Sequence, residues 1–256
     1  MKDYKIVLVY IVGICLLLMS WEYLGEAYDS VRLFISTPSS VFRFVIQEYE
    51  SLLYSLFVTT LEAVIGLLIA SVLSFVLAVI CVRWNRLIDY ISPILIFSQV
   101  IPLIVLAPFF IILLGIGVQS KIAMAAITSF FPIFINFIAG YNQIPKSIIE
   151  MAILYNMNFR DKFRHIYLPL SARNIFAGMK ISSTMAVIAA IVGEFSGASS
   201  GIGHNLLICT YRLEPDLLMA NLLLSITLGC LLYLGVVFVE RRCMGDWYLK
   251  SMKVIN

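Results

Sequence analysis

Charged residues are scarce in this chain. Only 13% of its 256 residues are charged and 61% are hydrophobic, whereas soluble domains have about 25% charged residues. A chain with so few charges cannot cover a water-exposed surface, so most of it must face lipid or other apolar helices. The net charge of +3 is too small to indicate a nucleic-acid-binding protein. The composition therefore indicates a membrane protein.

Patterns that carry catalysis, metal binding or nucleotide binding are also missing. His165 and His204 stand singly, and the five cysteines show neither metal-ligand nor disulfide spacing, so packing is the expected role of most of them. The sequence contains no G-x-x-x-x-G-K-[ST] segment and no G-x-G-x-x-G segment. We expect no cofactor, no metal and no ATP site in this chain.

Long apolar runs make up most of the sequence. A bilayer core about 30 Å thick needs roughly 20 apolar residues of helix. Six runs of approximately this length predict an all-α, polytopic membrane protein: Ile6–Leu24, Leu53–Val82, Ile91–Leu114, Ile122–Tyr141, Ile175–Phe195 and Leu217–Val239. Three prolines in the third run predict kinks covered by neighbouring helices, or a water-filled path beside that helix.

The positions of Lys and Arg predict the orientation of these helices. Lys2 and Lys5 precede the first run as in a signal peptide, but no cleavage site follows, so we expect a retained first helix. With both termini in the cytoplasm, most basic residues fall inside, as the positive-inside rule requires. Lys180 is expected to extend from the fifth helix to the cytoplasmic surface. The external basic residues would be Arg32, Arg43, Lys121 and Arg212.

The external segment between the first two runs is too polar to span the membrane. Thr37-Pro38-Ser39-Ser40 is typical of a helix start. The pattern after it predicts either an amphipathic helix at the outer interface or an ordinary structured loop. In the helix, Val41, Phe44, Val45 and Tyr49 would share one face, and Arg43, Gln47 and Glu50 another.

Residues 145–170 form a polar loop between the fourth and fifth runs, and they predict two short helices. Ser147 stands three residues before Glu150, which is the spacing of a capping box. An apolar stripe follows at helical spacing, and Asn156 suits a left-handed position after the last helical turn. A second helix should begin near Asn158 and end at Pro169. The stripe consists of Ile148, Met151, Ala152 and Tyr155.

This loop is too short and too charged to cross lipid, yet it carries an apolar stripe. Either a partner protein or the ends of the chain's own helices must cover that stripe. The order of residues resembles the cytoplasmic EAA loop of ABC importer permeases, E-A-A-x3-G-x9-I-x-L-P, without a gap. Met151 replaces the usual Ala and Asn156 the usual Gly. The matching positions are Glu150, Met151, Ala152, Asn156, Ile166, Leu168 and Pro169.

Segments outside the loop extend the resemblance over about Leu53 to Arg242. The stretches at 98–102, 107–108 and 115–117, and the segment Glu194–Gly203, are similar to the nitrate/sulfonate/taurine branch of these permeases. The glycines at 197, 201 and 203 predict a flexible external turn before a short segment, Asn205–Tyr211. We expect one permease domain, 1–256, with a first helix and external segment at 1–52 and a core at 53–242.

The resemblance implies a fold, a function and a set of partners. It implies a type I importer fold in the bacterial inner membrane, in which two copies, expected to be identical, form the pore. Two separate ABC ATPase subunits, which hold Mg-ATP, would bind the polar loops, and an extracytoplasmic solute-binding protein would deliver the solute. The family carries small anions such as nitrate, taurine or alkanesulfonates, and also pyrimidine-type vitamin precursors.

Polar side chains within the apolar runs are candidates for the substrate path, because such groups usually face a bundle interior or water. Glu62 has no evident partner acid, and Glu194 is near the outer end, where water exposure would explain it. Hydrogen bonds between or within helices explain the others equally well. The candidates are Glu62, Gln99, Asn136, Ser183, Thr184 and Glu194.

Two other classes of protein remain as alternatives. A membrane-embedded enzyme would need paired acids, a Ser/His pair or a metal cluster at membrane depth, and the sequence shows none of these. A stand-alone secondary carrier would not need the polar loop, and inverted repeats would favour it.

Overall fold

The computed structural model describes residues 13, 16, 19–23 and 36–255, with the side chains of Ser98 and residues 246–255 left out. The predicted first span, Ile6–Leu24, lies mostly outside these residues, as does Arg32. Within 36–255 every regular element is a helix: α3 (Pro38–Gln47), α4 (Tyr49–Arg83), α5 (Arg86–Ser98), α6 (Leu103–Leu114), α7 (Val118–Asn142), α8 (Lys146–Leu154), α9 (Phe159–Lys162), η1 (Phe163–Tyr167), α10 (Leu168–Phe195), α11 (Ile202–Arg212) and α12 (Pro215–Ile255).

Four helices in the described part of the chain are long and apolar enough to cross a membrane. They are Tyr49–Arg83, Val118–Asn142, the continuous stretch Phe159–Phe195, and Pro215–Gly245. They contain the predicted second, fourth, fifth and sixth spans. The structure thus confirms the all-helical fold of the described residues and supplies four candidate membrane spans, and the total of six stays a prediction.

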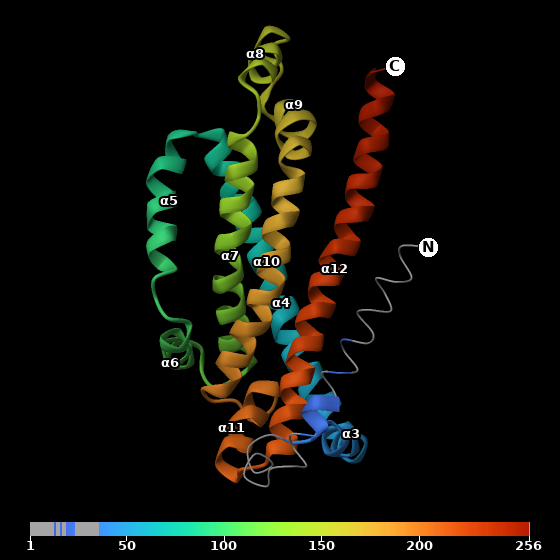
Figure 1. Ribbon diagram of the computed structural model, residues 1–256. Coiled ribbons are helices and arrows are strands. Elements are labelled where there is room, and N and C mark those ends of the chain that lie inside the picture. The colour runs from blue at the N-terminus through green and yellow to red at the C-terminus, as the bar shows by residue number, and fades with distance from the viewer. Residues whose placement is uncertain (1–12, 14–15, 17–18, 24–35, 256) are drawn as a thin grey trace, which may run out of the picture.

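The predicted third span is not one helix. The run from Ile91 to Leu114 is divided between α5 and α6, and the break lies at residues 99–102. Pro102 has no amide hydrogen and disfavours helical geometry in the residue before it, so the helix ends there and restarts. Pro93 and Pro108, by contrast, lie inside α5 and α6. Figure 1 shows α5 and α6 to one side of α7.

The centre of the molecule is a bundle in which α7 packs along both α4 and α10 (Figure 1). Glycines allow this close approach, as is usual between membrane helices. A Cβ atom at Gly66 of α4 would lie 2.4 Å from the Cβ of Ala125 of α7, and one at Gly178 of α10 would lie 2.6 Å from the carbonyl oxygen of Pro132. Ser129 and Ser182 also exchange hydrogen bonds, each hydroxyl donating to the other residue's carbonyl.

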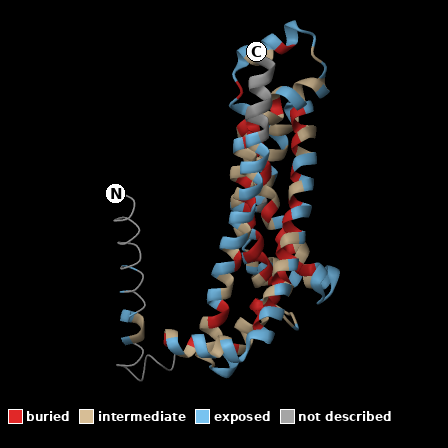
Figure 2. Ribbon diagram, turned by 90° about the vertical axis from the view of Figure 1, so that its right-hand side faces the viewer, coloured by how far each residue is buried: buried red, intermediate tan, exposed pale blue. Residues whose placement is uncertain are grey.

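Helix α12 is the least buried of the four long helices. It contacts α10, α11 and α3, and its C-terminal half diverges from the bundle (Figure 1). In Figure 2 buried residues line the inner faces of the helices, while exposed residues dominate the outside. The Lys180 ammonium on α10 forms an ion pair of 2.6 Å with Glu240 on α12. This ion pair gives Lys180 a structural role between α10 and α12, and its extension to the cytoplasmic surface stays a prediction.

The predicted amphipathic segment is helix α3, and its N-cap is Thr37, as expected. Val41 is buried against Leu52 and Ala220, and Phe44 and Val45 pack on the same cluster. Helix α3 lies at the end of the bundle that also carries α11, opposite the end that carries α8 and the C-terminal end of α12 (Figure 1). Assignment of the α8 end to the cytoplasm stays a prediction from the basic residues.

Candidate functional site

The polar loop begins with α8, which extends beyond the end of the bundle (Figure 1). Its apolar stripe divides into two parts. Ala152 is buried and Ile148 packs on Val82 and Tyr167, so these residues hold α8 to the chain's own helices. On the other part of the stripe Met151 is 53% exposed and Tyr155 76%, and Leu154, which lies beside the stripe, is 83% exposed. These three side chains form an uncovered apolar surface at the tip of a water-exposed loop.

The sequence predicted the C-terminal end of α8 correctly and its N-terminal end incorrectly. The capping box is wrong: Pro145 precedes the helix, no side chain caps it, and Ser147 lies inside it. Pro145 is the N-cap residue, and its side chain has no oxygen that could accept from the first amides of the helix. The other end is as predicted, because Asn156 has a left-handed φ of 52° and its neighbour Met157 donates to the carbonyl of Ala152.

The second half of the loop continues directly into α10. Asn158 caps α9 by accepting a hydrogen bond from the amide of Asp161, as predicted. Pro169 does not end this element: it lies in the first turn of α10, directly after the π-helical turn η1. Proline has no amide hydrogen to donate. A π-turn changes which amides bond to which carbonyls, so the helix can continue although this donor is missing. Such turns are frequent at functional sites.

Aromatic side chains connect the loop to the bundle. Phe163 of η1 lies 5.9 Å from the ring of Phe75 on α4 and 6.4 Å from that of Phe137 on α7, measured between centroids. The guanidinium of Arg83 lies 4.9 Å from the ring centre of Phe159. A displacement of the loop would therefore act directly on both α4 and α7, since close-packed rings transmit displacement rather than absorb it.

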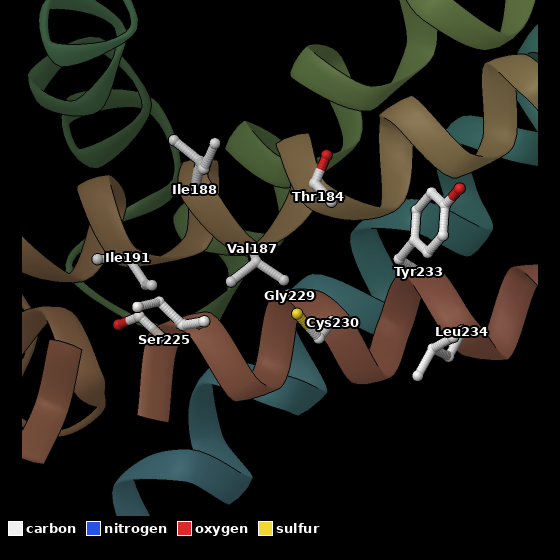
Figure 3. Close-up of a pocket in the computed structure, with 10 residues that line it drawn as sticks. Thr184, Val187, Ile188, Ile191, Ser225, Gly229, Cys230, Tyr233 and Leu234 are labelled. Carbon is white, nitrogen blue, oxygen red and sulfur yellow. The ribbon is translucent and has the colours of Figure 1, made fainter. Parts of the chain in front are cut away.

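A groove of about 520 Å³ separates α10 from α12. Figure 3 shows side chains of the two helices along it. Thr184 lines this groove, and none of its ten lining residues is charged. Of the predicted path residues, Thr184 is the only one that lies here. The lining residues are Thr184, Val187, Ile188, Ile191, Ser225, Ile226, Gly229, Cys230, Tyr233 and Leu234.

The remaining path candidates do not converge on that groove. Gln99 is exposed at the break between α5 and α6. The Asn136 amide donates to the carbonyl of Pro132 in its own helix, at 2.7 Å. Ser183 is buried and donates to the carbonyl of Lys180, and Thr184 likewise bonds within α10. Hydrogen bonds within their own helices therefore account for Asn136, Ser183 and Thr184.

Glu194 is fully buried, contrary to the expectation of water exposure. Its carboxylate accepts hydrogen bonds from the Thr59 hydroxyl and from the Gly203 amide, each at 2.7 Å. Thr59 in turn accepts from the amide of Ile202, at 2.9 Å. The first two amides of α11 are thus satisfied by α4 and α10, while the N-cap residue Gly201 supplies no side chain. A negative group is favourable at this end of a helix.

The predicted flexible turn is therefore a packed, bonded segment. A Cβ at Gly201, whose φ is +111°, would lie 2.1 Å from Glu194 Oε1, and one at Gly203 would lie 2.1 Å from the carbonyl oxygen of Ile191. Asn205 extends the network by donating to Ser55 on α4 and Asn221 on α12. These bonds join α4, α10, α11 and α12 at the end of the bundle that carries α11.

Glu62 and Lys121 complete this buried cluster. Thr59, one helical turn before Glu62 on α4, donates to the Glu194 carboxylate, so the two predicted path acids lie near each other. Lys121 was expected at an exposed external position but is 2% exposed, because its stem packs against α10 at Gly193. Its ammonium donates to the carbonyls of Ile116, Gly117 and Gly197. Sequence reasoning missed Lys121 and Thr59; a lysine that begins a long apolar helix was the available signal.

The fold and the polar loop together define a polytopic membrane protein that exposes an apolar surface outside its spans. The chain belongs to the family of binding-protein-dependent transport system inner membrane components, whose model matches residues 70–244. It is accordingly a permease subunit of an ABC transport system, with an ATPase and a solute-binding protein as the partners of such systems.

Individual relatives agree with this assignment. A probable ABC transporter permease protein of Haemophilus influenzae is 27% identical over 91% of this chain and 94% of its own length. The formylaminopyrimidine transport permease protein of Halalkalibacterium halodurans is 30% identical over 74% of this chain and 76% of its own. An aliphatic sulfonates transport permease protein of Bacillus subtilis, described as putative, is 24% identical over 88% and 82%.

Solved structures show a similar fold. The structure is similar to a chain of the MetNI methionine ABC transporter in an inward-facing conformation, with a TM-score of 0.62. The match covers 76% of this chain and 94% of that one at 20% identity.

Proposed function

We propose that this chain forms the translocation path of an ATP-driven importer and that its polar loop docks a separate ATPase. The observation that carries this proposal is the uncovered apolar surface of Met151, Leu154 and Tyr155 on α8, outside every candidate span. A surface of this kind exposed to water favours a partner protein.

The coupling we propose follows from how α8 is attached. Mg-ATP is held by the partner ATPase, and its closure would displace α8 at the exposed surface. Ala152 and Ile148 fasten α8 to the bundle, and Phe163 of η1 lies against α4 and α7. The displacement would therefore reach α4 and α7, and through the packing of α7 on α10 one wall of the groove, without any nucleotide chemistry in this chain.

The pore would be formed by two copies of the chain, expected to be identical. The groove between α10 and α12 lies on the least buried of the long helices, and a second copy would cover it. An external solute-binding protein would deliver the solute at the end that carries α3 and α11.

The solute is a small molecule of the nitrate, taurine or alkanesulfonate type, or a pyrimidine-type vitamin precursor. The uncharged lining of the groove, Thr184 and Tyr233 among it, favours the pyrimidine type, because an anion would require a cationic partner at that depth. Measuring which solute the cognate binding protein retains decides between them: retention of an anion and not of a pyrimidine contradicts the preference.

Docking is tested by co-purification of the ATPase with a tagged chain. Leu154→Glu places a charge in the exposed surface and is expected to abolish co-purification and transport, while the chain still inserts in the membrane. The matched control is Tyr211→Glu, since Tyr211 is 81% exposed at the opposite end, and it should retain the ATPase. Undiminished ATPase binding by Leu154→Glu would remove the proposed role of the loop.

A further inference from the structure

The carboxyl groups of Glu62 and Glu194 form a buried pair that has no part in the transport mechanism proposed above. Both side chains are 2% exposed or less, and they come from different helices, α4 and α10. Thr59, one helical turn before Glu62 on α4, donates to the Glu194 carboxylate at 2.7 Å, so the two acids lie near each other on neighbouring helices. Two ionised carboxylates are both acceptors, so they cannot bond to each other without a proton between them.

The two acids differ in the donors that surround them. Glu194 receives hydrogen bonds from Thr59 and from the amide of Gly203, as an ionised carboxylate would. Glu62 Oε2 is buried and, among the residues that the structure describes, has no hydrogen-bond partner. An ionised oxygen that is buried without a hydrogen-bond donor loses its hydration and gains nothing in return, which is costly in free energy. The atom therefore needs a ligand that the protein's own donors do not supply.

Within the described part of the chain, Lys121 is the one Lys or Arg side chain near the two acids. Its geometry does not supply the missing partner of the Glu62 oxygen. Its stem packs at Gly193, the residue before Glu194, yet among the described residues it forms no ion pair with either acid within 4.0 Å, and its ammonium donates to three carbonyl groups instead. Two ionised acids with one ammonium would leave one net negative charge in the interior. One added proton makes the cluster neutral, which low-polarity surroundings favour.

The other elements packed around the cluster bring one further titratable side chain, His204. Helix α6, which contacts α7 and α10, has no titratable residue. Helix α11 carries His204 next to the Gly203 amide, and α12 contributes the neutral amide of Asn221.

We propose that Glu62 and Glu194 form a buried proton-binding site, with the proton on Glu62 and donated to Glu194. The proton comes from solvent when the chain folds, and no covalent bond is formed or broken apart from the O–H bond on Glu62. Because Glu194 also accepts from the Gly203 amide and from Thr59, which holds the Ile202 amide, the proton keeps α11 fastened to α4 and α10. This inference does not depend on which solute is carried or on the ATPase.

Infrared spectroscopy of the full-length chain reconstituted in lipid tests the site, because a protonated carboxyl has a C=O band separate from that of carboxylates. The native chain is expected to show this band near neutral pH, with a shift in deuterium oxide. Glu62→Gln should abolish it, since Glu194 and Lys121 then balance each other. The matched control, Glu240→Gln, removes a carboxylate that is ion-paired with Lys180 and should leave the band unchanged.

A second variant keeps the test decisive if Glu62→Gln does not fold. Lys121→Met removes the balancing cation, so the need for a proton grows and the band is expected to persist or increase. Absence of the band in the native chain would overturn the proposal, because both acids would then be ionised. Retention of the band in Glu62→Gln, or its loss in Lys121→Met, would overturn it as well.

Discussion

Gly201 lies directly against the carboxylate of Glu194, at a distance where a single added methyl carbon would come within 2.1 Å of Oε1. The backbone of Gly201 also has a φ of +111°, a conformation that side-chain-bearing residues rarely adopt. Glycine is therefore required here for two independent reasons, close approach and backbone conformation, and the start of α11 depends on both.

We expect Gly201→Ala to destabilise the folded chain by about 2–4 kcal/mol, the sum of overpacking and backbone strain. Thermal unfolding in detergent measures this effect. Gly235→Ala is the matched control, because a Cβ at Gly235 would meet nothing within 4 Å, and it should leave the unfolding temperature unchanged or slightly raised. Equal effects of the two substitutions would contradict the packing described for Gly201.

The ion pair between Lys180 and Glu240 predicts a charge-swap result. Each single reversal, Lys180→Glu or Glu240→Lys, leaves two like charges 2.6 Å apart in the native geometry and should cost about 1–4 kcal/mol, since both side chains are only partly exposed. The double variant restores the pair and should recover most of the loss. Thermal unfolding of the three variants measures it, and no recovery in the double variant would show that the pair contributes nothing.

The left-handed conformation of Asn156, with a φ of 52°, predicts an ordering of substitutions. Asn156→Gly should be neutral or slightly stabilising, whereas Asn156→Ala should cost about 1–2 kcal/mol, because a Cβ is disfavoured in this region. The measurement is thermal unfolding together with ATPase co-purification. Equal stability of the Ala and Gly variants would indicate that the loop adopts another conformation in the membrane.

Two cysteines predict opposite reactivity towards thiol reagents. Cys230 is exposed in the groove between α10 and α12. Cys209 is buried, and burial raises the pKa of its thiol, so at any given pH a smaller fraction is the reactive thiolate. In chains that keep only one of these cysteines, we expect a membrane-permeant maleimide to label Cys230 and not Cys209.

Assembly adds a second outcome to the same measurement. If a second copy covers the groove, Cys230 should be protected in the assembled transporter and labelled in the separated subunit. Equal labelling in both states would place the second copy elsewhere.

Accessibility labelling decides which end of the bundle is cytoplasmic. Tyr155→Cys and Tyr211→Cys place thiols on residues that are 76% and 81% exposed, on α8 and α11 respectively. A membrane-impermeant reagent should label Tyr211→Cys in intact cells and Tyr155→Cys only in inverted vesicles. Labelling of Tyr155→Cys from outside would exclude contact with an ATPase.

Much of the fold followed from the sequence because membrane helices are specified locally. Apolar runs of sufficient length located α4, α7, α10 and α12, since a helix satisfies its own backbone in lipid. The left-handed Asn156 and the cap at Asn158 were also predictable, because they depend on neighbours in sequence. The break at Pro102 was missed because several prolines were present, and only packing decides which of them ends a helix.

By itself the sequence determined which segments are helical, which loop is exposed, and the family to which the chain belongs. Only the tertiary structure decided that Glu62, Lys121 and Glu194 meet, that Thr59 and Glu194 hold the start of α11, and that Lys180 pairs with Glu240. The physical reason is that burying a charge is costly anywhere in the chain, but the partner that compensates it can lie more than a hundred residues away, as Thr59 does from Glu194.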